Sequence, residues 1–291
     1  MTQMALFATF SRRFSKGRAA LALGASALLF AMAPVAHAAD ENNTALETIK
    51  QRGTLTVAFY KDYAPFSNDG KGIDVDLAGA LAAKLGVKML PIWFNANEKL
   101  VDDLRKMVWN GTPLSSPADL LMHVPVDPRL MSMVEKVKIF APYHRERFAI
   151  GRNREQLPAL ENLEPFEKQT FAVAGESMAG DVMLSADGGR YSKNARIFKE
   201  TEDAINALKS GAVAAAFGEQ GELEGALRDD ARFAIESPPH PLLKQQWSVG
   251  LAVKSDSTEL ATALQSAMDE LLADGTVTRI MQHYGVQDRR P

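Results

Sequence analysis

Short apolar runs alternate with helical stripes along the first half of the chain. Residues 53–59 form an apolar run typical of a buried strand, and leucines then recur every four positions from Leu77 to Leu85, on one face of a predicted helix. A second strand over 87–94 and a second helix over 98–109 repeat this order. Strand, helix, strand and helix in succession indicate a parallel α/β sheet.

A stretch rich in turn-forming residues interrupts this order. Residues 110–117 contain Asn, Gly, Ser and Pro, and a strand resumes at 120–122. We expect a further loop through Pro125, Pro128 and Pro142, because proline has no N–H to donate to a ladder of strands.

The alternation begins again in the second half of the chain. We predict a strand over 170–174, a turn at 175–177 and a helix that starts at Met178. A helix capped at Thr201 and a strand over 212–217 follow. The second half therefore repeats the architecture of the first.

The last segment is predicted to return to the first unit. A strand over 248–253 leads into a long helical region that is interrupted at 274–275. The chain is predicted to cross between two α/β lobes near 145–152 and again near 244–254. Two such crossings are typical of proteins whose lobes open and close about a hinge. The predicted segments are a signal peptide (1–38), lobe 1 (39–147), lobe 2 (148–247) and a return to lobe 1 (248–291).

The first 38 residues are predicted to be a targeting segment and not part of the fold. Basic residues precede an apolar run over 19–33, and Ala36-His37-Ala38 supplies an A-x-A cleavage site. That run of roughly 15 residues is short for a membrane helix, which needs about 20. We therefore expect export to the periplasm. The stretch 11–16, SRRFSK, is either a twin-arginine signal with shortened spacing or an ordinary basic region.

Composition narrows the classes of function. The predicted signal carries four of the 33 Lys and Arg residues and no acid, so the mature chain keeps 29 basic against 36 acidic residues, a net charge of −7. Neither sign forms a long block, which argues against a nucleic-acid partner. Without cysteine there is no disulfide, thiolate metal site, Cys nucleophile or lipid anchor. The five His residues form no spaced cluster, so we expect no metal and no cofactor.

Aromatic residues gather where the first two predicted strands end. Tyr60, Tyr63 and Phe66 follow the first strand, and Trp93 and Phe94 end the second. The carboxyl ends of parallel strands meet at one edge of a sheet, where α/β folds bind ligands. We predict that these rings contribute to a ligand wall. The alternative is that they close the core of the lobe.

Several segments resemble a known family. The stretches GTLTVAFYKDYAPFSNDGKGIDVDLAGALAAKLGV, TFAVAGESMAGDVML, TEDAINALKSGAVAAAFGEQ and WSVGLAVKSDSTELATALQSAMDELLADGTVTRIMQHYGV are similar, in this order, to bacterial extracellular solute-binding proteins of family 3. That family includes the polar amino acid receptors of ABC importers. The resemblance implies a two-lobed periplasmic binding protein-like fold with a ligand cleft between the lobes.

The resemblance also implies a binding site. In such proteins an Arg of the first lobe and a helix amino terminus of the second hold a carboxylate, and an acid of the second lobe takes the ammonium. Here Ser177 and Met178 stand at the helix start and Glu219 near the usual acid. Residues 123–129, HVPVDPR, stand where the family commonly has a Thr-x-x-Arg segment. Arg129 is therefore the candidate for the arginine that holds the carboxylate. This departure weakens a specificity for α-amino acids.

Three shorter motifs point to a second possibility. PFSN at 65–68, LLMHVP at 120–125 and APYHRERF at 141–148 are similar to a branch of this fold that is associated with periplasmic quinoprotein methanol dehydrogenases. Catalysis is not expected, because the stretch around Ser177 has Ala179 where a G-x-S-x-G elbow needs glycine.

These observations predict a monomeric periplasmic solute-binding protein that captures a small polar solute, amino acid-like or an organic acid, by closing its hinge. The expected partner is an ABC permease in the inner membrane. The alternative is an accessory protein, without a transport role, that docks on a periplasmic PQQ-dependent dehydrogenase.

Overall fold

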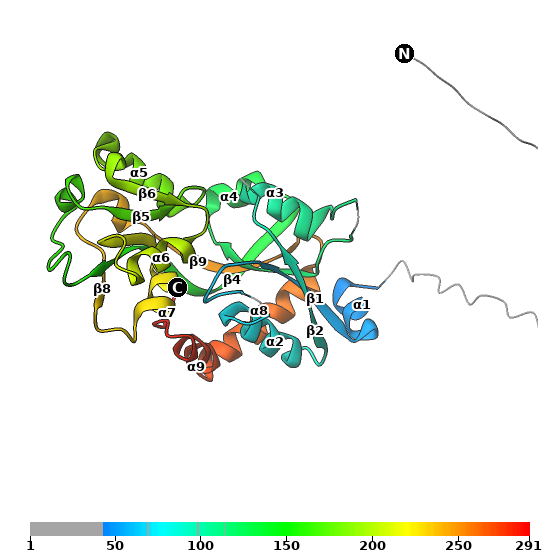
Figure 1. The fold of residues 1–291 in the computed structure, drawn as a ribbon. Coiled ribbons are helices and arrows are strands. Elements are labelled where there is room, and N and C mark those ends of the chain that lie inside the picture. The colour runs from blue at the N-terminus through cyan, green and yellow to red at the C-terminus, as the bar shows by residue number, and fades with distance from the viewer. Residues whose placement is uncertain (1–42, 69, 98, 114) are drawn as a thin grey trace, which may run out of the picture. The chain divides into compact units, whose positions relative to one another are not determined.

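Strands from both halves of the chain line up in one sheet in the computed structural model, which describes residues 43–68, 70–97, 99–113 and 115–291 (Figure 1). The predicted signal peptide lies outside the described residues. Eight of the nine described strands form a path, in which neighbours are hydrogen-bonded, and β8 (Phe233–Glu236) pairs with β4. The path runs β2 (Lys88–Phe94), β1 (Thr54–Tyr60), β3 (Leu120–Pro125), β9 (Gln246–Lys254), β4 (Val137–Asn153), β7 (Ala215–Glu219), β5 (Phe171–Ala174) and β6 (Ala195–Phe198).

Each half of the sheet has a parallel centre, as the sequence predicts. In the first half β1 is parallel to β2 and β3, and in the second β5 is parallel to β6 and β7. We call the first half with its helices lobe 1 and the second half with its helices lobe 2. Both lobes are parts of one compact unit.

One long strand joins the lobes. The residues of β4 up to Arg147 pair with β9, whereas those from Phe148 onward pair with β7 and β8. The strand therefore changes partners between Arg147 and Phe148, and β9 begins beside this point with Gln246. The lobe boundaries drawn from the sequence stay a prediction.

The expected loop through Pro142 is wrong, because β4 runs across this residue. The pairing of β4 with β9 shifts register between Phe140 and His144, and Ala141 adopts a left-handed φ of 49°. A bulge of this kind accommodates a proline in a strand, because the extra residue needs no partner in the ladder.

The helices of lobe 1 bury one face against its sheet. In α2 the buried positions include Leu77 and Leu81, the residues that the four-residue spacing singles out. The single helix expected over 98–109 is instead a short α-helix, α3, that continues as a π-helical turn over Arg105–Trp109. The lobe 1 helices are α1 (Ala45–Arg52), α2 (Ile73–Lys84), α3 (Leu100–Leu104), α4 (Pro128–Met133), α8 (Thr258–Ala273) and α9 (Thr276–His283).

Lobe 2 contains a helix that the sequence pattern does not predict. Residues 218–221 look like a turn, but Glu219 ends β7 and α7 begins at the next residue. The backbone N–H of Glu219 donates to the carboxylate of Glu222 at 3.2 Å, which supports the helix start. The lobe 2 helices are α5 (Met178–Gly189), α6 (Thr201–Lys209) and α7 (Gln220–Leu227).

None of the helices in the described part of the chain is long and apolar enough to cross a membrane.

Candidate functional site

A cavity of about 310 Å³ lies between the two lobes. Its walls come from the carboxyl ends of β1 and β3 in lobe 1, and from the end of β7 and the starts of α5 and α6 in lobe 2. The sites of α/β folds gather at such strand ends. The cavity is lined by Tyr60, Lys61, Asp62, Tyr63, Ala96, Asn97, Leu100, Asp103, His123, Pro125, Ser177, Met178, Ala179, Glu200, Thr201, Glu219, Glu222, Trp247 and Val249.

The start of α5 is built by a serine cap and a close approach of the backbone. The Ser177 hydroxyl accepts from the N–H of Gly180 and donates to the carbonyl of Ala174, each at 2.9 Å. Position 180 excludes a larger residue, because a Cβ there would lie 2.0 Å from the Ala174 carbonyl oxygen. The helix start therefore sits directly against the end of β5, with Met178 and Ala179 on the cavity.

A chain of hydrogen bonds crosses the cavity from one lobe to the other. The Tyr63 hydroxyl of lobe 1 donates to Oε2 of Glu219 of lobe 2 at 2.6 Å. The same hydroxyl lies 3.1 Å from Nε2 of His123, and Nδ1 of His123 lies 3.0 Å from the buried carboxylate of Asp74. Tyr143 donates to the other oxygen of Asp74 at 2.5 Å. Four buried or half-buried side chains therefore hold Glu219 in place.

Burial shifts the protonation of these groups. It raises the pKa of Glu219 to about 7, and the nearby Glu146 carboxylate adds to the rise. Burial also raises the pKa of Glu222 well above its usual range, and the charge of Glu219 adds to this. Burial lowers the pKa of His123, but the charge and hydrogen bond of Asp74 outweigh it, so that pKa is raised overall. Glu219 therefore titrates near neutral pH, beside a histidine whose pKa is raised.

The geometry accommodates one proton in two places. In the first arrangement a protonated His123 donates to the Tyr63 oxygen, and Tyr63 donates to the Glu219 carboxylate. In the second, Glu219 holds the proton and donates to Tyr63, which donates to a neutral His123. The charge state of the cavity acid is thus linked to that of a histidine buried on Asp74.

A second set of contacts joins the lobes behind the cavity. Phe66 and Pro65 of lobe 1 pack on two glycines of α7, where a Cβ at Gly221 would lie 2.6 Å from Cζ of Phe66 and one at Gly225 2.7 Å from Cγ of Pro65. Only glycine fits such a close approach without displacement.

The chain terminus adds ion pairs to this contact. Arg289 reaches Glu224 of α7 with Nη1–Oε1 at 2.7 Å, and its Nη2 lies 3.0 Å from Oε1 of Glu146 in β4. Glu146 also accepts from the N–H of Gly221 at 3.0 Å and lies 2.8 Å from Nε2 of His144. The start of α7 is therefore held to lobe 1 by both packing and charge.

The residues predicted for the site divide into two groups. Tyr60, Tyr63, Ser177, Met178 and Glu219 line the cavity together. Their contact with a ligand stays a prediction, but the fold brings them to one place from distant parts of the chain.

The other predicted residues lie elsewhere. Phe66 is fully buried in the core of lobe 1, Trp93 stacks on Phe59 with centroids 5.1 Å apart, and Phe94 packs on Tyr60 at 4.6 Å. Arg129 is exposed on α4 and does not line the cavity, so its position gives no support to the carboxylate clamp.

Sequence reasoning missed several lining residues. Glu222 stands three residues after Glu219, and the E-x-x-E spacing of a helix start is the signal that could have pointed to it. Asp103 is buried in α3 and accepts from the Tyr60 hydroxyl at 3.2 Å. Nothing in its local pattern distinguishes it from an exposed helix acid. Trp247, the residue directly before the predicted strand over 248–253, was also missed.

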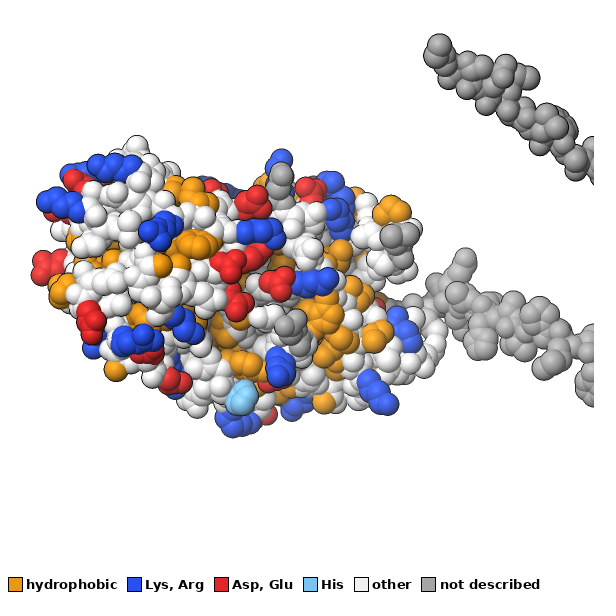
Figure 2. Space-filling model, in the orientation of Figure 1, with side chains coloured by type: hydrophobic (Ala, Val, Ile, Leu, Met, Phe, Trp, Pro, Cys, Tyr) orange, Lys and Arg blue, Asp and Glu red, His pale blue; other side chains and the backbone are white. Residues whose placement is uncertain are grey.

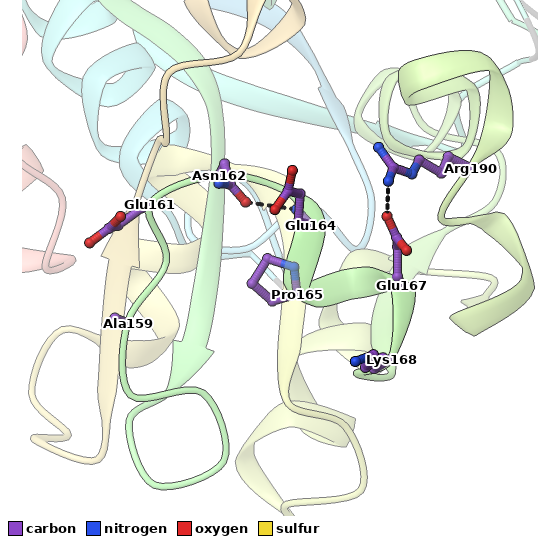
Figure 3. A pocket seen from close by; sticks show the side chains of 8 residues that line it. All are labelled: Ala159, Glu161, Asn162, Glu164, Pro165, Glu167, Lys168 and Arg190. Atoms are coloured by element: carbon purple, nitrogen blue, oxygen red, sulfur yellow. Dashed lines mark hydrogen bonds and ion pairs between the residues drawn. The ribbon is translucent and has the colours of Figure 1, made fainter.

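A larger hollow of about 600 Å³ lies on lobe 2 alone (Figure 3). Its charged side chains lie at the surface, where Arg190 pairs with Glu167 and the Asn162 side chain accepts from the N–H of Glu164 at 2.9 Å. Exposed pairs of this kind are common surface features. The cavity between the lobes, with its buried acids, is the better candidate.

Comparisons with known proteins support the fold. No protein-family model and no curated protein matches this chain. The structure of an ancestral cationic amino acid solute-binding protein is similar, at 21% identity and a TM-score of 0.65, over 82% of this chain and 99% of that one. An amino acid ABC transporter substrate-binding protein from Streptococcus pneumoniae, bound to L-arginine, shares 21% identity at a TM-score of 0.63, over 84% and 98%.

A third similar structure belongs to an ancestral amino acid-binding protein described as a precursor of cyclohexadienyl dehydratase. It shares 20% identity at a TM-score of 0.60, over 82% of this chain and 99% of that one. At such identities the likeness shows the fold alone. The predicted two-lobed fold of periplasmic binding proteins is thereby confirmed.

Proposed function

We propose that this protein is a solute-binding protein that takes a small polar solute into the cavity between its lobes and delivers it to an ABC permease in the inner membrane. The observation that carries the proposal is the cavity itself, which draws acids, amides, hydroxyls and aromatic rings from both lobes. Ligand pockets combine apolar walls with a few convergent polar groups in this way. The named neighbours support the same role, since two are described as solute- or substrate-binding proteins.

Movement of the lobes would couple binding to recognition. The lobes are connected through β4, which changes partners between Arg147 and Phe148, and through the chain that enters β9 at Gln246 beside this point. A ligand that touches both lobes favours the closed arrangement, because only there does it make all its contacts. The permease would then distinguish the loaded protein from the empty one.

Binding, and not catalysis, is the role that we assign to the cavity. The hydrogen-bonded groups around Glu219 can hold a proton, but the Ser177 hydroxyl that lines the cavity is engaged in capping α5. The alternative role beside a quinoprotein dehydrogenase finds no support in the comparisons, and we do not carry it further.

A thermal-shift screen tests the proposal. Purified protein is heated with amino acids, amines and organic acids at millimolar concentration, since a ligand of the native state raises the melting temperature. We expect one chemical class to raise it by several degrees. A flat response to every compound, followed by silence in calorimetric titrations, would contradict a solute-binding function.

A further inference from the structure

The charges that line the cavity are one-sided. Among the described lining residues, five acids stand against one lysine, Lys61, which is exposed, and the imidazole of His123. Figure 2 shows acidic side chains gathered in the middle of this face, with basic side chains at their edge. The net potential of such a cavity attracts cations and repels anions. The five acids are Asp62, Asp103, Glu200, Glu219 and Glu222.

The two inner acids have no cation as a direct partner among the described residues. Glu219 is held by a phenol, Tyr63, and Glu222 by the backbone N–H of Glu219. His123 reaches Glu219 only through that phenol. A buried carboxylate without a direct counter-charge is unfavourable, and a positive ligand group would relieve this.

The arginines behind the cavity are already engaged. Arg289 pairs with Glu224 and Glu146, and Arg147 donates to the side chain of Gln220. None of the described arginines lines the cavity, and Arg129 is exposed elsewhere on lobe 1. The described walls of the cavity therefore lack a guanidinium group that could bind a ligand carboxylate through two hydrogen bonds.

A metal ion is a poorer occupant than an organic cation. In the described part of the chain, no group of three or more His, Asp or Glu side chains is placed to hold a metal. Tyr60, Tyr63 and Trp247 line the same cavity, and the faces of aromatic rings attract ammonium and guanidinium groups. The volume of about 310 Å³ is suited to a small molecule.

We infer that the cavity binds a small organic cation, an amine or a guanidine, and recognises it without needing a carboxylate. This inference rests on the proposed solute-binding function and names its ligand class. The ammonium or guanidinium lies against Glu219 and Glu222, and the aromatic rings cover its apolar part. A carboxylate on the ligand finds no arginine among the described walls, and only the start of α5 and the exposed Lys61 would favour it there.

Matched pairs of ligands test this inference. Isothermal titration of the purified protein compares arginine with agmatine and ornithine with putrescine, because each pair differs only by the carboxylate. Glutamate and succinate serve as anionic probes. We expect agmatine or putrescine to bind at least as tightly as its amino acid, and the anions to give no binding heat.

The outcomes separate the inference from the proposed function. If arginine binds and agmatine is tenfold weaker or silent, the carboxylate is needed, and the inference fails while solute binding stands. If glutamate or succinate binds in preference to the amines, the inference of a cation site also fails, while the proposed solute-binding function stands. Silence with all six compounds contradicts both.

Two variants locate the site. Glu219→Gln and Glu222→Gln each replace a carboxyl group with an amide of nearly the same shape, which cannot become an anion beside the ligand. We expect each to weaken amine binding at least tenfold. Glu161→Gln, an exposed acid of the hollow on lobe 2, is the matched control and should leave affinity unchanged. If Glu219→Gln and Glu222→Gln bind the amine as tightly as the control variant does, the inference is overturned. Thermal unfolding of each variant confirms that it is folded.

Discussion

The Tyr63 hydroxyl donates to Glu219 across the cavity at 2.6 Å, and this contact joins lobe 1 to lobe 2. The acid best placed to receive a ligand cation is therefore already held by a neutral donor of the same chain. A cation that binds Glu219 has to compete with this phenol or share the carboxylate with it. That contact therefore competes with a bound cation and adds to the other contacts that hold the lobes together.

Removal of this phenol should strengthen cation binding. Tyr63→Phe keeps the ring but leaves the Glu219 carboxylate without its donor, so a ligand ammonium gains more from it. We expect affinity for the bound amine to rise roughly threefold to tenfold, with about 1 kcal/mol of stability lost, the usual worth of one hydrogen bond. Titration calorimetry and thermal unfolding measure the two effects.

The matched control is Tyr191→Phe, which removes a 2.7 Å hydrogen bond to Asp187 within lobe 2. It should lower stability without any change in affinity. Weaker binding by Tyr63→Phe would show that the phenol contacts the ligand and does not compete with it.

Cation binding should depend on pH through Glu219. Because the pKa of this acid is raised to about 7, it is charged above that pH and increasingly neutral below it. A cation needs the charged form, so affinity should be steady from pH 8 upward and fall by up to about tenfold per pH unit below 7. Calorimetry in buffers of different ionisation enthalpy should detect proton release on binding near pH 6. Constant affinity between pH 5.5 and 8.5 would exclude Glu219 as the ligand's partner.

The same shift makes Glu219 a source of instability at high pH. An acid whose pKa is higher in the folded state than in the unfolded state favours folding most at low pH. This contribution is fully present below the unfolded pKa of 4.5 and is lost as pH rises through the folded pKa of about 7. Glu219→Gln should therefore raise the free energy of unfolding at pH 8, by about 1 to 2 kcal/mol since the carboxylate is only half-buried. At pH 5 the gain should nearly vanish. Denaturant unfolding at both pH values checks the sign, and a loss of stability at pH 8 would contradict it.

The glycines of α7 should control the approach of the lobes. Gly225→Ala places a methyl group 2.7 Å from Cγ of Pro65, against a proline ring that cannot easily shift. We expect a loss of about 1 to 3 kcal/mol and a larger radius of gyration in X-ray scattering. Gly79→Ala in α2 is the control, because nothing lies within 4 Å of its Cβ position. It should stabilise the protein by about 0.5 to 1 kcal/mol.

Local pattern was informative wherever neighbours in sequence decide the structure. The spacing of Leu77 and Leu81 predicts the buried face of α2, and the apolar run before Tyr60 predicts β1. The prediction failed at Pro142, where β4 continues, because pairing with β9 stabilises a strand that the local sequence does not favour. It also missed α7, whose small residues resemble a turn until Phe66 and Pro65 pack on them.

By itself the sequence determined the two repeated α/β units and placed polar and aromatic residues at strand ends, among them Tyr60, Tyr63 and Glu219. Those features depend on periodicity and on residue type, which are local. Only the tertiary structure decided which of these side chains face the cavity. It buried Phe66, left Arg129 exposed on α4 and set Tyr63 against Glu219, 156 positions away. Contacts over such separations depend on how the two lobes pack, and no local pattern encodes that packing.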